Sequence, residues 1–210
     1  MSHYFEAVPG TPSDRKVVSY RCAGMNFEFI TDTSVFSRGD VDKGTDLLIN
    51  TVIDDIKKKG ASKGEALLDL GCGWGVVGVV MQSVFMSFDV TMTDINTRAV
   101  ELSKENAELN RVRPKKIVSG NALDAIGEDE RFDTVMTNPP VRAGKDVVFS
   151  FYEGAFAHMK EGGAIYVVLQ RKQGAPSTEK KLRELFGNCE TLSISGGYRV
   201  MRSIKEKEIT

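Results

Sequence analysis

From residue 66 onward, short apolar runs alternate with stretches of helical periodicity. The apolar runs, which predict buried strands, are residues 66–71, 88–94, 116–120, 132–138 and 163–170. The segments with helical spacing are 75–85, 96–110, 147–159 and 178–186. Strands that alternate with helices form a parallel sheet, because each crossover helix must lie over a face of the sheet. The pattern therefore predicts a doubly wound α/β domain.

The two ends of the chain depart from this alternation. Residues 191–205 contain two strand-like runs joined at Gly196-Gly197, which predicts an antiparallel hairpin and completes a mostly parallel sheet of seven strands. Residues 1–60 instead show strand character on either side of Gly24, followed by an amphipathic helix that ends in three lysines before Gly60. We expect residues 1–60 to be a small β/α extension packed on a main domain of residues 61–210.

Composition narrows the classes of function. The 28 basic and 29 acidic residues nearly cancel, so a polyanion would have to bind through a local basic face. Three widely separated cysteines provide neither a zinc knuckle nor a disulfide framework, and two histidines argue against a histidine-based metal site. We expect no signal peptide, because the first residues lack a basic region followed by an apolar core, and no apolar run reaches the roughly 18 residues that span a bilayer. We therefore expect a cytoplasmic protein that uses no metal.

A glycine-rich loop, DLGCGWGVVG at residues 69–78, follows the first strand of the main domain and begins a helix. Glycines allow a tight turn there, and the free N–H groups of the helix then face a ligand. Gly73, Gly75 and Gly78 also match the dinucleotide pattern GxGxxG, and Asp94, about twenty residues on, can accept ribose hydroxyls. The loop thus predicts an adenosine-like ligand. A nicotinamide or other nucleotide, and a simple tight turn, remain open alternatives.

Two features of the loop favour another cofactor. Asp69 lies two residues before the first glycine, where a carboxylate can anchor the loop and meet a cationic group. The glycines run as GxGxG from the end of the strand, which is a tighter turn than a dinucleotide loop needs. Together with Asp94, this segment resembles the S-adenosylmethionine loop of class I methyltransferases.

The sequence Asn138-Pro139-Pro140 ends the apolar run at residues 132–138. Proline cannot donate to a β-ladder, and Asn138 before it is held extended, so the asparagine side chain is expected to point into the crevice at the carboxyl ends of the strands. The amide oxygen of Asn138 and the carbonyl of Pro139 would then be two fixed acceptors for a planar amino group, whose nitrogen lone pair is directed toward a methyl donor. The simpler alternative is a strand-ending turn.

From about residue 30 to the end, the chain resembles the ribosomal small-subunit RNA guanine-N2 methyltransferases, most closely their short single-domain members. The matching segments are VFSRGDVDKGTDLLI, LLDLGCGWGVVG, MTDINTRAVELSKENAELN and TNPPVRAGK. The resemblance implies a class I methyltransferase (Rossmann-like) fold and S-adenosylmethionine as the cofactor. The cofactor residues that it implies are Asp69, Gly71, Gly73, Gly75, Asp94, Ile95, Asn121 and Ala122, while Asn138, Pro139 and Pro140 would hold the target amine.

Further candidates precede the first helix. The resemblance places Phe36, Arg38 and residues 42–46, which include Thr45, over the cofactor, although Phe36 could be ordinary core and Thr45 could cap a helix that begins near Asp46. Many relatives carry an aromatic residue after the second proline, where this chain has Val141. We predict that Val141, Arg142, Lys145 and Arg171 contact the substrate, with the cations near its phosphates. Trp74 could line the cofactor site or fill a gap between helix and sheet.

These observations predict a methyltransferase that modifies an exocyclic amine, with guanine N2 of 16S ribosomal RNA as the preferred target. The expected partner is ribosomal RNA or the small ribosomal subunit, with the target base flipped or unpaired. A protein glutamine amide or an adenine amine would fit the same clamp. Alternatives from other classes are a nicotinamide- or nucleotide-binding protein without methyl transfer and a non-catalytic S-adenosylmethionine-binding module.

Overall fold

The computed structural model describes residues 11–120 and 123–206. Asn121 and Ala122, which were predicted to contact the cofactor, lie outside the described residues. None of the described helices is long and apolar enough to cross a membrane.

A seven-stranded sheet forms the centre of the molecule, in the order β5-β4-β3-β6-β7-β9-β8. Its strands are β3 (Ala66–Leu70), β4 (Asp89–Asp94), β5 (Lys116–Ser119), β6 (Phe132–Thr137), β7 (Met159–Gln170), β8 (Glu190–Ser195) and β9 (Tyr198–Ile204). The first five are parallel, and β9 runs antiparallel between β7 and the edge strand β8. The predicted doubly wound sheet with a terminal antiparallel hairpin is therefore confirmed.

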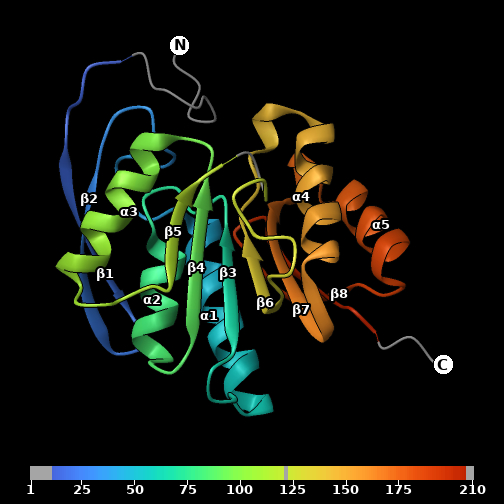
Figure 1. The fold of residues 1–210 in the computed structure, drawn as a ribbon. Coiled ribbons are helices and arrows are strands. Elements are labelled where there is room, and N and C mark those ends of the chain that lie inside the picture. The colour runs from blue at the N-terminus through green and yellow to red at the C-terminus, as the bar shows by residue number, and fades with distance from the viewer. Residues whose placement is uncertain (1–10, 121–122, 207–210) are drawn as a thin grey trace.

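Helices cover both faces of this sheet (Figure 1). One layer consists of α1 (Lys43–Lys59), α2 (Val76–Val84) and α3 (Thr97–Leu109), and the other of α4 (Lys145–Ala157) and α5 (Ala175–Phe186). Strand side chains alternate between the two layers: Leu67 packs in the first core and Leu68 in the second. Strands buried on both faces must be apolar throughout, which is why they stand out in the sequence.

An antiparallel hairpin of β1 (Lys16–Cys22) and β2 (Met25–Thr31) lies beside α3, at the left of Figure 1. Two asparagines one helical turn apart, Asn106 in α3 and Asn110 at its C-cap, bind the backbone of β2. Asn106 accepts from the N–H of Ile30 at 2.6 Å and donates to its carbonyl at 2.8 Å, and Asn110 binds Glu28 in the same way at 3.2 and 2.7 Å. The helix thus satisfies an edge strand that would otherwise be exposed.

Helix α1 joins this extension to the main sheet. Asp55 on α1 accepts hydrogen bonds from Tyr166 of β7 at 2.6 Å and from Arg202 of β9 at 2.7 and 2.9 Å. Hydrophobic residues of α1 belong to the same core as α2 and α3. The division of the chain at residue 60 remains a proposal.

The start of α1 differs from the sequence expectation. The helix begins at Lys43 instead of near Asp46, and its cap is Asp42, whose carboxylate accepts from the N–H groups of Gly44 at 2.8 Å and Thr45 at 3.3 Å. Thr45 therefore lies inside the first turn and is not the cap. Aspartate and threonine are both favoured at this position, so the sequence alone did not distinguish them.

Candidate active site

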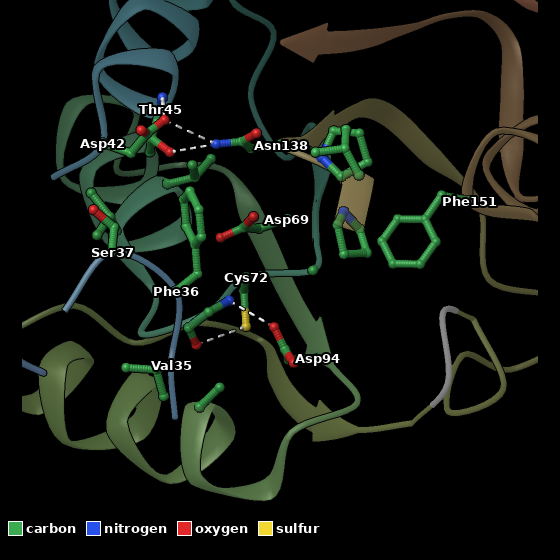
Figure 2. Close-up of a pocket in the computed structure, with 18 of the residues that line it drawn as sticks. Val35, Phe36, Ser37, Asp42, Thr45, Asp69, Cys72, Asp94, Asn138 and Phe151 are labelled. Atoms are coloured by element: carbon green, nitrogen blue, oxygen red, sulfur yellow. Dashed lines mark hydrogen bonds between the residues drawn. The ribbon is translucent and has the colours of Figure 1, made fainter. Parts of the chain in front are cut away.

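A cavity of about 620 Å³ opens where the parallel strands end. Its wall includes the ends of β3 and β4, the segment after β6, the start of α1 and the segment before it. The volume is in the usual range for small-molecule sites, and the location matches the crevice where doubly wound sheets bind ligands. Figure 2 shows Asn138, Asp69 and Asp94 following one another along this wall.

The glycine loop presents bare backbone to the cavity. Gly71, Gly73 and Gly75 all have positive φ angles, of 75°, 55° and 87°. A Cβ at Gly75 would lie 3.1 Å from the Cα of Ser103, and one at Gly71 would lie 3.1 Å from the ring of Phe151. Any other residue would be strained at all three positions and also crowded at Gly71 and Gly75. These positions therefore favour glycine, and the bare backbone lets a ligand approach the loop closely.

Two carboxylates accept hydrogen bonds from backbone N–H groups of the glycine loop and the start of α2. Asp69 on β3 accepts a hydrogen bond from the N–H of Gly78 at 2.9 Å, which anchors the first turn of α2. Asp94 accepts from the N–H groups of Gly73 at 2.8 Å and Asn96 at 2.9 Å. Burial raises the pKa of Asp69 to about 7 and that of Asp94 to about 6. A cationic ligand would favour the ionised form of both groups.

The segment before α1 forms another part of the wall. Trp74 is 3% exposed, and its indole nitrogen donates to the carbonyl of Phe36 at 2.7 Å. Its ring also packs edge-on against Phe29 of β2, with 5.3 Å between centroids and 71° between planes. Trp74 therefore both lines the cavity and fills the space between the extension and the loop. Phe36 and Thr45 line the same cavity, and we propose that both contact the cofactor.

Asn138 follows the last residue of β6 and lines the cavity, as its position in the sequence predicted. Its amide nitrogen donates to the hydroxyl of Thr45 at 3.0 Å and to a carboxylate oxygen of Asp42 at 3.3 Å (Figure 2). The carbonyl of Pro139 accepts from the N–H of Val141 at 2.8 Å, which fixes its direction and leaves it one further lone pair. Pro139 and Pro140 also line the cavity.

Of the four residues predicted to contact the substrate, two line the cavity and two lie outside its lining. Val141 and Arg142 line the cavity, whereas Lys145 and Arg171 are exposed residues outside its lining. Lys145 begins α4 and lies 5.0 Å above the ring of Phe149, and Arg171 follows β7. Their proposed contact with RNA would therefore be at the rim of the site.

Asp42, in the segment that the resemblance placed over the cofactor, lines the cavity, but three other lining residues were not foreseen from the sequence. These are Phe151, Gln170 and Tyr198. Phe151 lies on α4 at a spacing that predicts core packing, and Tyr198 begins β9 of the terminal hairpin. The local sequence contains no signal for either position, because only the tertiary fold brings α4 and β9 to the glycine loop.

The lining residues fit S-adenosylmethionine. The glycine backbone allows close approach, Asp94 suits the hydroxyls of an adenosine, Ile95 adds an apolar contact, and Asp69 offers negative charge for a cationic amine or sulfonium. Among residues 11–120 and 123–206, no group of three or more histidine, cysteine or acidic side chains is placed to hold a metal ion. We keep the individual cofactor contacts as proposals.

Comparisons with known proteins identify the family. The model of the methyltransferase small domain matches residues 26–202. The chain is 37% identical over 203 residues to the uncharacterized protein YbxB of Bacillus subtilis, which covers 97% of this chain and 98% of that protein. It is 31% identical over 177 residues to the ribosomal RNA small subunit methyltransferase C of Erwinia tasmaniensis, covering 82% of this chain and 48% of that protein.

One solved structure is similar over nearly the whole chain. It is the T. thermophilus 16S rRNA N2 G1207 methyltransferase (RsmC) in complex with AdoMet and guanosine, with a TM-score of 0.84 and 27% identity. The match covers 93% of this chain and 52% of that chain. The chain thus spans about half the length of the ribosomal RNA methyltransferases it matches, which confirms the predicted resemblance for their shared part. This protein belongs to the methyltransferase small domain family and is an S-adenosylmethionine-dependent methyltransferase.

Proposed function

We propose that the protein methylates the exocyclic N2 amine of guanine in small-subunit ribosomal RNA. The observation that carries this proposal is the orientation of Asn138. Its amide nitrogen is bonded to α1, so its oxygen is the atom left to accept a hydrogen bond from a ligand in the cavity. The structurally similar methyltransferase that contains AdoMet and guanosine supports guanine as the base.

In this proposal Asn138 and Pro139 hold the target amine. The amide oxygen of Asn138 and the remaining lone pair of the Pro139 carbonyl each accept one N–H bond, which fixes the plane of the amino group and the direction of its nitrogen lone pair. When bound, S-adenosylmethionine would supply a methyl group activated by the positive charge on its sulfur. The amine nitrogen would form a bond to the methyl carbon as the carbon–sulfur bond breaks, which leaves S-adenosylhomocysteine, and the nitrogen would lose one proton to solvent. Because positioning does most of this work, no histidine is required.

The rim of the cavity suits the backbone of an RNA substrate. Arg142 and Lys145 follow β6, and Arg171 and Lys172 follow the neighbouring strand β7, so these cations share the edge of the sheet at which the cavity opens. All four are exposed, and none forms an ion pair with another described residue. We propose that they contact phosphates, while the target base is flipped into the cavity.

An aromatic surface for the base is available despite the valine after the second proline. Val141 is half-buried against the core of α4 and α5, whereas Phe151 lines the cavity from α4. We propose that Phe151 provides the apolar contact that an aromatic residue at position 141 supplies in relatives. A glutamine amide or an adenine amine would fit the same pair of acceptors, and the guanosine bound by the similar enzyme favours guanine over them.

The test uses labelled S-adenosylmethionine with ribosomal RNA and with small subunits from cells that lack the protein. We expect N2-methylguanine in the digested nucleosides by mass spectrometry. Asn138→Ala should bind the cofactor with unchanged affinity and lose about a hundredfold or more in turnover. Asn50→Ala, which removes an exposed asparagine on α1, is the matched control. Label in adenine or in protein, or unchanged turnover of Asn138→Ala, would refute the proposal.

A further inference from the structure

The segment Asp42-Lys43-Gly44-Thr45 at the start of α1 reaches across the cavity to Asn138. Both hydrogens of the Asn138 amide have an acceptor there, Thr45 Oγ1 at 3.0 Å and Asp42 Oδ2 at 3.3 Å. No described side chain or backbone group donates to the amide oxygen of Asn138. Figure 2 shows the amide nitrogen directed toward Asp42 and Thr45. The contacts span 96 and 93 residues of sequence, so they depend on the tertiary fold.

Of these two acceptors, the carboxylate determines which end of the amide faces the cavity. An ionised carboxylate only accepts hydrogen bonds, so a flipped Asn138 would place its oxygen against another oxygen. The hydroxyl of Thr45 can donate or accept, so it stabilises either orientation. A flipped amide would present N–H groups to the cavity, where they would meet the N–H groups of the target amine. Asp42 thus excludes the orientation that could not hold an amine.

Asp42 is itself held on two sides. One carboxylate oxygen accepts from the N–H of Gly44 at 2.8 Å, and the other accepts from the hydroxyl of Tyr198 on β9 at 3.2 Å. Gly44 leaves room for that tyrosine, because a Cβ there would lie only 2.6 Å from a ring carbon of Tyr198. Each residue of the segment except the exposed Lys43 therefore has a distinct contact, which gives Asp42 one fixed position.

We propose that Asp42 and Thr45 are positioning residues that set the orientation of the Asn138 amide, with Tyr198 holding Asp42 in place. Asp42 has this role in addition to capping α1. The inference rests on the proposed methylation of an amine held by Asn138. It predicts that changes at Asp42 reduce turnover without a matching loss of cofactor binding; because Thr45 is also a proposed cofactor contact, its variants are compared on kcat.

Asp42→Ser is the most direct variant. Serine caps helices about as well as aspartate, so α1 should remain folded. Its hydroxyl is one bond shorter than the carboxylate, so it can accept from the N–H of Gly44 without reaching Asn138, which leaves only Thr45 beside the amide and removes the preference for one orientation. We expect at least a tenfold lower kcat, with the Kd for S-adenosylmethionine and the KM for RNA within twofold of the wild type. Turnover within twofold of the wild type would overturn the proposal.

Thr45 provides a second pair of variants, which also decides the case if Asp42→Ser does not fold. Thr45→Val removes the hydroxyl at nearly constant volume, and Thr45→Ser restores it. We expect Thr45→Val to lose several-fold in kcat and Thr45→Ser to recover most of it. Equal rates for the two would contradict the proposal. Tyr20→Phe is the matched control, because it removes a 2.7 Å hydrogen bond to Asp46 in the same helical turn, outside the cavity.

A measurement without RNA separates this inference from the proposed function. In NMR spectra of ¹⁵N-labelled protein, the side-chain NH₂ protons of Asn138, assigned with Asn138→Asp, should exchange slowly with solvent. Exchange should become faster in Asp42→Ser and remain slow in Tyr20→Phe. If the wild type methylates no RNA but these signals behave as expected, the proposed function fails and the orientation of Asn138 stands. Unprotected Asn138 protons in the wild type would refute the inference directly.

Discussion

The two carboxylates beneath the glycine loop should make cofactor affinity depend on pH. Burial raises the pKa of Asp69 to about 7 and that of Asp94 to about 6 in the ligand-free protein. The positive charges of S-adenosylmethionine would favour both ionised forms, so binding below these pKa values must release protons. Affinity should therefore fall as the pH is lowered through 7 and 6.

The size of the effect follows from the two pKa values. At pH 6 Asp69 would be about nine-tenths protonated and Asp94 about half, whereas at pH 7 only Asp69 would be half protonated. Together these fractions weaken binding about tenfold at pH 6 relative to pH 7, or about 1.4 kcal/mol. The cofactor's own amino group titrates near 8 and stays charged throughout this interval.

Isothermal titration calorimetry in buffers of different ionisation enthalpy measures both the affinity and the number of protons released. At pH 6.5 we expect about one proton released for each cofactor bound, shared between the two carboxyls. Asp69→Asn keeps an acceptor for the N–H of Gly78 and should reduce the pH effect to about twofold, which leaves only the contribution of Asp94. Constant affinity between pH 6 and 7, with no proton release, would refute the reasoning.

The same shifts fix the sign of the stability effect. Both folded pKa values lie above the ordinary value of 3.8, so these groups stabilise the ligand-free fold most when they are protonated. That contribution is fully present below pH 3.8 and is lost as the pH rises through about 6 and 7. The cofactor should therefore raise the melting temperature more at pH 7.5 than at pH 5.5, which differential scanning calorimetry would test.

Two further substitutions test the packing around the loop. In Gly78→Ala the new Cβ would lie 2.5 Å from the terminal methyl of the buried Met92. This overpacking should outweigh the gain in helix propensity and lower the free energy of unfolding in urea by about 1–2 kcal/mol. Gly39→Ala, whose Cβ would have nothing within 4 Å, should leave the stability unchanged. Equal stability of the two variants would show that Met92 can move aside. Trp74→Phe removes the 2.7 Å hydrogen bond to the carbonyl of Phe36 and should lower the free energy of unfolding by about 1–3 kcal/mol. It should also weaken cofactor binding measured by calorimetry. Unchanged affinity would show that Phe36 does not depend on this hydrogen bond.

The central strands and the Asn138 motif could be predicted because each is encoded by neighbouring residues. Leu67 and Leu68 on β3 face opposite layers, and such burial on both sides requires a continuous apolar run. The end of β6 is equally local, since two prolines after Asn138 cannot continue a ladder. The glycine loop is recognisable for the same reason, because its positive φ angles leave few residue types that fit.

Contacts between distant segments could not be predicted in this way. Asp42 and Thr45 are both acceptable caps in sequence, and the choice between them depends on where Tyr198 and Asn138 lie in the fold. Phe151 has the spacing of a core residue, and it is indeed 7% exposed, yet its ring also lines the cavity. The periodic pattern predicts that Phe151 is buried, but it does not reveal that the buried ring also forms part of the cavity wall.

The extension before α1 is an integral part of the site, although its sequence suggested an attachment to the main domain. Asn106 on α3 binds the backbone of β2 and, at 2.8 Å, donates to the carbonyl of Trp74 in the glycine loop. Trp74 in turn holds Phe36 at the wall of the cavity. A single asparagine thus joins the hairpin, the loop and the cavity wall, so movement of any one of them would disturb the other two. These contacts explain why the segment from Phe36 to Thr45 lines the same cavity as the glycine loop and Asn138, although its own sequence contains neither motif.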